Sequence, residues 1–193
     1  MARPAYRGDQ PTARERLREA FWVLLEKEGY GRITVKELAS QAGVNPNTFY
    51  YHYTAMEDLA RDALDAEKLH EIPEAIRDSA RPGNVSLEDA LSLVAVGDRW
   101  RRIRLFSSSD SSVLRRLFYE AFEDFWLSLL GVSRQDLSDE DALDLAFMLN
   151  GAMGVIALQG DDYDMGYVRS LPERPLGRGL NETVERLAER YRA

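Results

Sequence analysis

Apolar residues recur every three or four positions through much of the first 70 residues, a spacing that predicts amphipathic helices. One helix is expected from Thr12 to Glu28, a short one follows Thr34, and another follows Thr54 until Pro73 bounds it. Their apolar positions are Leu17, Ala20, Phe21, Leu24 and Leu25; Val35, Leu38, Ala39 and Ala42; and Met56, Leu59, Ala60, Ala63 and Leu64. No stretch shows the alternation typical of strands, so the whole chain is predicted to be all-α.

Start and stop signals frame these helices. Each begins at a threonine that has a glutamate three residues later, the spacing of a capping box in which side chains and backbone amides satisfy one another. The pairs are Thr12–Glu15, Thr34–Glu37 and Thr54–Glu57. Gly29 and Gly43 stand where the first two helices must end, and glycine tolerates the positive φ that such ends favour.

A second short helix is expected directly after the turn at Gly43. Asn45 is a good N-cap, Pro46 is a good first helical residue, and Phe49 is the single apolar anchor. The remaining positions are polar or aromatic, which indicates a helix presented outward: Asn47, Thr48, Tyr50, Tyr51 and His52. Two short helices around a glycine turn, residues 34–53, form a helix-turn-helix, whose second helix lies in the DNA major groove.

Further helices are predicted in the rest of the chain. The pattern favours helices over 86–105, 111–130 and 139–159, and a last one of about a dozen residues that Asn181 caps. Segments 79–84 and 160–179 are rich in Gly and Pro or polar residues and are predicted to be loops. We expect a flexible basic arm over 1–11, a DNA-binding domain over 12–56 and a second helical domain over 57–193.

Charge is unevenly distributed along the 193 residues, whose net charge is −8. Residues 1–56 hold eight Lys and Arg against six Asp and Glu, whereas residues 57–193 hold seventeen against twenty-seven. DNA affinity depends on the charge near the phosphates, so the mildly basic first part predicts modest non-specific binding. There is no cysteine, no secretory signal is visible, and no apolar run approaches membrane-spanning length, so a cytoplasmic protein without a membrane partner is expected.

Residues 12–70 resemble the DNA-binding domain of the TetR family of transcriptional repressors. The resemblance rests on Thr34, Ala42-Gly43-Val44, Thr48-Phe49-Tyr50, His52-Tyr53 and Glu57-Asp58-Leu59. Two positions depart from the family's pattern: Asn47 stands where the family usually has Gly, and Met56 stands where it usually has Lys. The first departure favours a different approach to DNA or a base contact, and the second removes an expected phosphate anchor.

The predicted DNA contacts follow from the helix-turn-helix and the resemblance together. An Asn side chain can bond adenine bidentately, a Thr can touch a thymine methyl, and Tyr hydroxyls reach phosphates. At Thr34, capping and phosphate binding at a helix N-terminus are both open, and Lys36 is either a DNA contact or merely solvated. The predicted set is Thr34, Lys36, Asn45, Pro46, Asn47, Thr48, Tyr50, Tyr51 and His52.

The resemblance also implies a second domain that binds a small-molecule effector and forms a homodimer through its last two long helices. Candidate effector contacts are Trp100, Arg104, Phe118, Phe122, Trp126, Phe147 and Asn150, although an aromatic stripe is more often simply core. The arginine-rich run 99–104 is open to two other interpretations, a solvated helix end or a nucleic-acid contact. Candidate dimer contacts are Ala146, Leu149, Ala152, Met153, Val184 and Leu187.

Other chemistry finds little support. His52 and His70 are the only histidines and form no metal motif, and the acidic residues Asp161, Asp162 and Asp164 lack the glycine that a calcium loop needs. No nucleophile motif or phosphate loop is present, so we expect no catalytic residue, cofactor or metal. The sequence therefore predicts a ligand-responsive dimeric repressor that binds a palindromic operator. The alternatives are a helical interaction module that does not bind DNA and an all-α enzyme.

Overall fold

The computed structural model describes residues 11–65, 67–73, 98–158 and 170–191. Contacts divide the chain into two compact units, Met1–Ala63 and Leu64–Ala193. The N-terminal unit therefore extends further than the predicted boundary at residue 56 and takes in most of the helix that follows it. All regular elements in these residues are α-helices or single 3-10 turns, which confirms the all-α prediction for this part of the chain.

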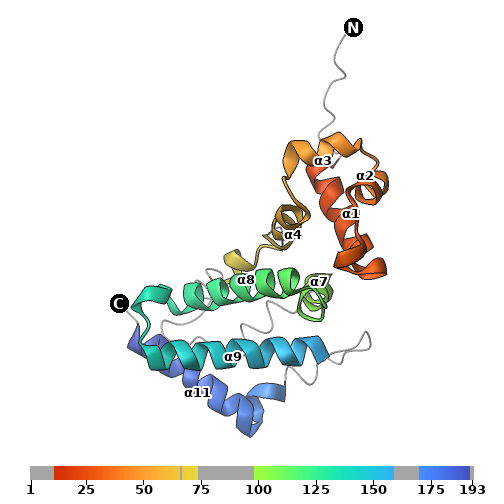
Figure 1. Cartoon of the computed structure of the whole chain (residues 1–193). Helices are drawn as coiled ribbons and strands as arrows, with labels where there is room; N and C mark the ends of the chain where they lie inside the picture. The colour runs from red at the N-terminus through yellow and green to blue at the C-terminus, as the bar shows by residue number, and fades with distance from the viewer. Residues whose placement is uncertain (1–10, 66, 74–97, 159–169, 192–193) are drawn as a thin grey trace. The chain divides into compact units, whose positions relative to one another are not determined.

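The N-terminal unit holds α1 (Ala13–Glu28), η1 (Tyr30–Arg32), α2 (Val35–Gln41), α3 (Pro46–His52) and most of α4 (Met56–Asp65). Helices α1, α2 and α3 pack on one another, as Figure 1 shows. Their core consists of large apolar side chains with almost no exposed surface, and α3 contributes only one of them. These core residues are Leu17, Phe21, Leu38, Phe49 and Leu59.

Two of the three predicted capping boxes form as expected, at Thr12 and at Thr34. The third differs, because the backbone amides of Thr54 and Ala55 donate to Asp58 Oδ2, at 2.9 and 3.0 Å. Helix α4 begins at Met56, and Asp58 is the third residue counted from Ala55, so the box spacing is kept but displaced by one residue.

The end of α4 also differs from the prediction of a helix that continues toward Pro73. The helix ends at Asp65, and Lys68 adopts a left-handed conformation with φ 58°. A left-handed residue cannot continue a right-handed helix, and a separate turn, η2 (Leu69–Glu71), follows it. Glu67, the residue before Lys68, is buried and accepts a hydrogen bond from Arg102 Nη1 at 2.7 Å.

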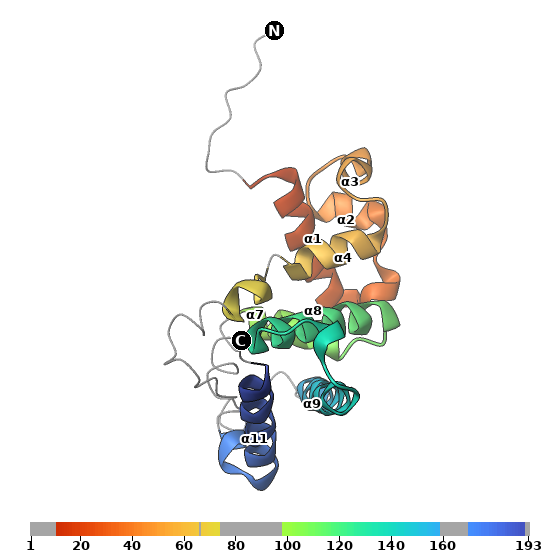
Figure 2. The same cartoon turned by 90° about the vertical axis from the view of Figure 1, so that its left-hand side faces the viewer.

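The C-terminal unit is built on α7 (Asp98–Ser107), α8 (Ser112–Leu130), α9 (Asp139–Leu158) and α11 (Pro175–Arg190), with turns η3 (Arg134–Asp136) and η4 (Leu171–Glu173). Helix α8 packs against α7 and α9, and α11 packs against both α8 and α9 (Figure 2). Ser111 caps α8 and Gly131 ends it with φ 70°, so the helix closely matches the predicted range 111–130. The predicted helix 86–105 is seen from residue 98 onward.

The last helix begins earlier than predicted. Helix α11 has 16 residues and starts at Pro175, inside the segment expected to be irregular. Asn181 is therefore not a cap, and its side-chain amide donates to Glu185 Oε1 at 2.7 Å within the helix. Proline suits the first helical position, so this Gly- and Pro-rich stretch starts a helix instead of preventing one. The predictions for residues 1–10, 79–97 and 159–169 lie outside the described residues.

Helix α9 is the most apolar of the helices that the structure describes. By length and composition alone it meets the criterion for a membrane span, with 33% of the window buried, although the sequence contains no unbroken apolar run of that length. One such helix is weak evidence for a membrane, because the core helix of a soluble protein meets the same criterion. Its first turn carries Asp139, Glu140 and Asp141, and Asp141 is buried.

Candidate nucleic-acid interface

Helix α3 presents a neutral, polar and aromatic surface. Asn45 caps it, with its side chain accepting from the Asn47 amide at 2.9 Å, and Pro46 is its first residue. Tyr50 and Tyr51 are 63% and 84% exposed. Asn47 and His52 are also exposed, and Thr48 is half-buried. The predicted base and phosphate contacts from Pro46 to His52 thus lie on one short helix that has neither Lys, Arg, Asp nor Glu.

Aromatic contacts order this surface from beneath. The buried Phe49 ring meets Tyr50 edge-on at 5.3 Å and Tyr53 at 5.6 Å. The ring of Tyr51 meets His52 edge-on at 5.0 Å. Edge-on pairs at these distances are favourable and restrict the rings, so both exposed tyrosines are held in place from one side.

The turn before α3 is held by α1. Gly43 adopts φ 62°, the left-handed conformation that favours glycine. Its carbonyl accepts from Arg16 Nη1 at 3.4 Å, and the Val44 amide closes the turn on Ala39 O at 2.9 Å. Arg16 is a contact that the sequence did not indicate, because it lies 27 residues before Gly43.

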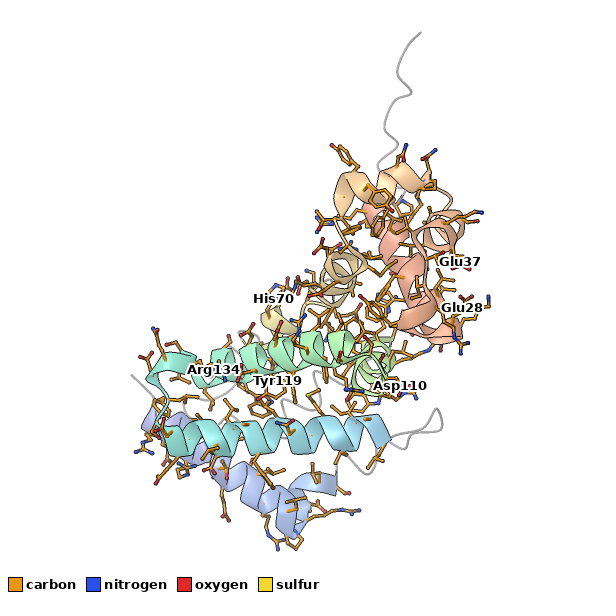
Figure 3. The ribbon with its side chains drawn as sticks, viewed as in Figure 1. Glu28, Glu37, His70, Asp110, Tyr119 and Arg134 are labelled. Carbon is orange, nitrogen blue, oxygen red and sulfur yellow. The ribbon has the colours of Figure 1, made fainter. Side chains whose placement is uncertain are left out.

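At the start of α2, the Thr34 hydroxyl donates to Glu37 Oε2 at 2.6 Å and accepts from the Glu37 amide at 3.2 Å. The Thr34 amide also donates to Glu37 Oε2 at 3.2 Å. The two bonds that Glu37 Oε2 accepts, from the Thr34 hydroxyl and amide, lower the pKa of Glu37, which Figure 3 labels. The capping interpretation of Thr34 therefore holds in the free protein. Lys36, the second residue of α2, is exposed, and its DNA contact stays a prediction.

The end of α3 is joined to α1 and α4 by one carboxylate. Asp62 of α4 accepts hydrogen bonds from Tyr53 Oη at 2.6 Å and from Arg14 Nε at 3.0 Å. Arg14 Nη2 donates to its second oxygen, and Arg18 Nη1 lies 3.8 Å from that oxygen. Burial by itself would raise the pKa of Asp62, but the hydrogen bonds from Arg14 and Tyr53 outweigh it and lower the pKa. Burial, followed by the bond to Asp62, raises the pKa of Tyr53. Sequence analysis missed this network, because Arg14 and Asp62 lie 48 residues apart.

The charge of this unit is balanced. Residues 11–63 hold seven Lys and Arg against eight Asp and Glu. Two of the arginines are directed at Asp62, and Arg16 is directed at the Gly43 carbonyl. Such a surface attracts phosphates weakly, so any discrimination has to come from hydrogen bonds and apolar contacts at base edges.

The predicted effector residues fall into two groups. Phe118, Phe122 and Trp126 are buried on α8, where Phe122 stacks on Phe118 at 5.6 Å and meets Trp126 edge-on at 6.3 Å. Trp100 and Arg104 are half-buried on α7, which packs against α8. These five therefore come from two adjacent helices, in agreement with either a core or a pocket wall.

Phe147 and Asn150 do not join them, which corrects the prediction for these two. Phe147 is 77% exposed, and Asn150 is exposed with its amide bonded to Ala146 O at 2.8 Å. The buried residues next to them on α9 are Leu145, Met148 and Leu149, so helical periodicity turns Phe147 to another face.

The predicted dimer residues need a matching correction. Leu149, Val184 and Leu187 have no exposed surface and belong to the core of a single protomer, because α9 and α11 pack on each other. Ala146, Ala152 and Met153 are partly exposed on α9. Sequence alone does not separate these groups, since all six are apolar positions on helices.

A buried carboxylate, that of Asp141, joins the start of α9 to the end of α11. Asp141 has no exposed side-chain surface and accepts from Arg186 at 2.6 Å, Arg190 at 2.9 Å and Tyr191 Oη at 2.7 Å. The Ser138 hydroxyl donates to it at 2.8 Å. Burial by itself would raise the pKa of Asp141, but these hydrogen bonds dominate and place it well below its usual range. Among the described residues, no group of His, Asp and Glu forms a metal site.

Comparisons with known proteins bear on both units. Residues 17–63, which run from α1 into α4, match the family model described as bacterial regulatory proteins, tetR family. The uncharacterized HTH-type transcriptional regulator YxbF of Bacillus subtilis (strain 168) is 31% identical over 84 residues, 43% of this chain. The chain spans only 22% of the length of that relative.

Solved structures match the whole fold. A protein from Mesorhizobium loti classed as a TetR-family transcriptional regulator has a TM-score of 0.54 at 17% identity, with 92% of this chain and 95% of that chain covered. The fatty acid degradation regulator FadR from Bacillus halodurans has a TM-score of 0.52 at 16% identity, with 93% and 96% covered. At these identities the likeness concerns the fold alone. The N-terminal helix-turn-helix unit is therefore similar, over residues 17–63, to the TetR family of bacterial regulatory proteins.

Proposed function

We propose that this protein is a transcriptional regulator that binds a palindromic operator as a homodimer in the cytoplasm and releases it when a small molecule binds. The observation that carries the proposal is α3, a seven-residue helix with one buried side chain and an outward row of polar and aromatic residues. In a helix-turn-helix this is the helix that enters the major groove.

The proposed readers are chosen by their chemistry and exposure. The Asn47 amide can bond an adenine edge, and Thr48 can touch a thymine methyl group. Tyr50, Tyr51 and His52 are exposed toward the end of the same helix and suit phosphate or base-edge contacts. The residues proposed to contact the sugar-phosphate backbone of the DNA precede them in the chain: Thr34, Lys36, Asn45 and Pro46.

The test is selection of genomic DNA fragments by the purified chain, followed by titration of the enriched duplex at two salt concentrations. We expect one palindromic site, with affinity lowered about tenfold or more by Asn47→Ala, since a bidentate base contact contributes about 1–3 kcal/mol. Tyr50→Phe should weaken binding less, because only one hydroxyl is lost. Tyr119→Phe, which removes a hydroxyl from α8 in the other unit, is the matched control.

Failure to enrich any duplex would favour the helical interaction module over the regulator. The balanced charge of residues 11–63 makes this a real alternative outcome. Weak binding that is uniform over unrelated sequences would count the same way, because phosphate contacts carry no sequence information.

The proposed dimer interface is the exposed apolar face of α9. Leu143, Phe147 and Leu158 are 71%, 77% and 86% exposed. Gly151 and Gly154 lie between them on the same face, and a Cβ at either would meet nothing within 4 Å, which leaves room for close approach of another helix. A second copy of the chain is the proposed occupant, since a palindromic operator needs two identical readers one helical turn apart.

Phe147→Asp tests this interface. A buried charge at the centre of an apolar contact should convert a dimer into a species of 22.0 kDa, the mass of one chain, in sedimentation velocity. Val23→Asp is the control, because Val23 is also an exposed apolar residue, on α1. Equal dissociation by both variants, or by neither, would contradict the proposed interface.

For the effector we propose the α7 and α8 residues Trp100, Arg104, Phe118, Phe122 and Trp126 as the surroundings. Support comes from Trp126, whose buried indole N–H has no hydrogen-bond partner among the described residues, an arrangement that a bound acceptor group would relieve. A ligand among these rings should change tryptophan fluorescence, and Trp126→Phe should reduce that change. An unaltered response in Trp126→Phe would place the effector elsewhere.

A further inference from the structure

Helix α3 is poorly anchored by its own sequence. It has seven residues, roughly 10 Å in length, and an isolated helix this short is unstable in water. Phe49 is its only buried residue. A single apolar contact leaves a helix free to rotate about that point, so the orientation of the reading face depends on the attachments at the two ends of α3. At its start, the turn at Gly43 is held by Arg16.

Tyr53 supplies the second attachment. It is the residue directly after the helix, it is 5% exposed, and its ring lies 5.6 Å from Phe49. Its hydroxyl donates to Asp62, which also pairs with two of the three arginines of α1, Arg14 and Arg18. The side chain of Asp62 is only 12% exposed, whereas that of Arg14 is 56% exposed, so the bond from the buried Tyr53 is the one best shielded from water.

The carboxylate is the hub of this arrangement. A planar Arg14 fork engages both oxygens of Asp62, which defines the direction of the carboxylate, and Tyr53 then bonds the oxygen that Arg14 Nε shares. The hydrogen bonds from Arg14 to Asp62 and from Tyr53 to Asp62 both have a preferred direction. They can therefore fix the orientation of α3, whereas the apolar contact at Phe49 cannot.

We propose that Asp62 is a positioning residue for operator binding: its carboxylate sets the orientation of α3 by holding Tyr53 against α1 and α4. The proposal rests on the proposed function for its effect on DNA, but its effect on α3 concerns the free protein. An α3 that is already oriented loses less conformational freedom on binding, so the operator is bound more tightly.

Electrostatics alone predicts the opposite change in operator affinity, so the direction of the change distinguishes the two explanations. Removing a negative charge from a DNA-binding domain strengthens attraction to phosphates. Glu57→Gln is the matched control, because it removes the same charge from the same helix at a side chain that pairs with Arg61 at 3.8 Å. Asp62→Asn and Glu57→Gln should therefore shift operator affinity in opposite directions.

The first measurement uses the full-length free protein. The chain has two histidines, His52 and His70, so the His52 imidazole signals can be assigned in NMR spectra with His70→Gln. The His52 ring lies 5.0 Å from Tyr51 and 6.1 Å from Tyr53 and so reports on the end of α3. Asp62→Asn should shift or broaden these signals, and Glu57→Gln should leave them in place. Unchanged signals in Asp62→Asn would overturn the proposal.

The second measurement titrates the duplex that the wild-type chain enriches from genomic DNA, at a temperature where every variant is folded. We expect Asp62→Asn to bind about tenfold more weakly, Tyr53→Phe about threefold more weakly, and the double variant no more weakly than Asp62→Asn. Affinity that is unchanged or raised in Asp62→Asn, or effects that multiply in the double variant, would reduce Asp62 to a stability residue. If no duplex is enriched, the proposed function fails and the NMR result still decides the role of Asp62.

Discussion

Both units of this protein use the same chemical device in different surroundings. In the N-terminal unit, Asp62 faces two arginines and a tyrosine: Arg14, Arg18 and Tyr53. In the C-terminal unit, Asp141 likewise faces Arg186, Arg190 and Tyr191. The side chain of Asp62 is 12% exposed, whereas that of Asp141 is not exposed at all.

The difference in burial assigns the two carboxylates different tasks. A fully buried carboxylate loses all its hydration and depends on its donors, so Asp141 is expected to contribute mainly to stability by joining α9 to α11. Asp62 keeps some hydration, so its loss should affect stability less. Its partner Tyr53, however, follows the recognition helix, so its loss should affect DNA binding more.

The largest effect is expected from Asp141→Asn. The variant keeps the shape of the side chain but leaves Arg186 and Arg190 without their shared charge, which should lower the free energy of unfolding by about 3 kcal/mol. Urea denaturation followed by circular dichroism measures it. A change below about 1 kcal/mol would show that burial does not separate the two carboxylates.

Asp62→Asn should have a smaller effect on the same measurement, about 1–2 kcal/mol, the range for charged hydrogen bonds that are partly hydrated. The comparison is sharpened by reading both variants in both assays: Asp141→Asn should leave operator affinity of the folded protein nearly unchanged. If Asp62→Asn lowered the free energy of unfolding more, and Asp141→Asn lowered operator affinity more, the roles proposed for the two carboxylates would be the wrong way round.

Acid should weaken the Asp141 network by about 1 kcal/mol at pH 3. The native pKa of Asp141 lies below its unfolded value, near 3.9, so its contribution is complete above about pH 5 and is lost as the pH falls through the native pKa. The free energy of unfolding, measured from pH 6 to pH 3, should fall less steeply in Asp141→Asn than in the wild type. Parallel curves would contradict the lowered pKa.

The smallest effect is expected where an arginine and a carboxylate meet without burial. Arg116 and Glu120 of α8 pair at 2.7 Å, four residues apart, with both side chains more than 40% exposed. Arg116→Gln should change the free energy of unfolding by about 0.5 kcal/mol or less. A loss as large as that in Asp62→Asn would show that the arginine partner, and not the burial, sets the strength of these pairs.

Sequence analysis did well where the deciding contacts are local. The capping boxes at Thr12 and Thr34, the cap at Asn45 and the turn at Gly43 all involve groups within five residues of one another. The exposed surface of α3 was predictable for the same reason, since a short helix with Phe49 as its single apolar residue can bury only one face.

Prediction failed where one local signal competed with another or where helical faces had to be chosen. Asp58 replaced Glu57 as the cap of α4 because the helix starts one residue later. Pro175 was a helix start within a segment that had the composition of a loop. On α9, where apolar residues occur on every side, the pattern did not indicate that Leu149 is buried and Phe147 is exposed.

The sequence by itself determined the helices of the N-terminal unit, the turn between α2 and α3, and the chemistry of the reading face. Only the tertiary structure decided which residues orient that face and which face of α9 stays open. The physical reason is distance along the chain: Asp62 meets Arg14 across 48 residues, and Asp141 meets Arg186 across 45. Such pairs form only when the helices that carry them have packed, so the spacing of residues along the chain does not predict them.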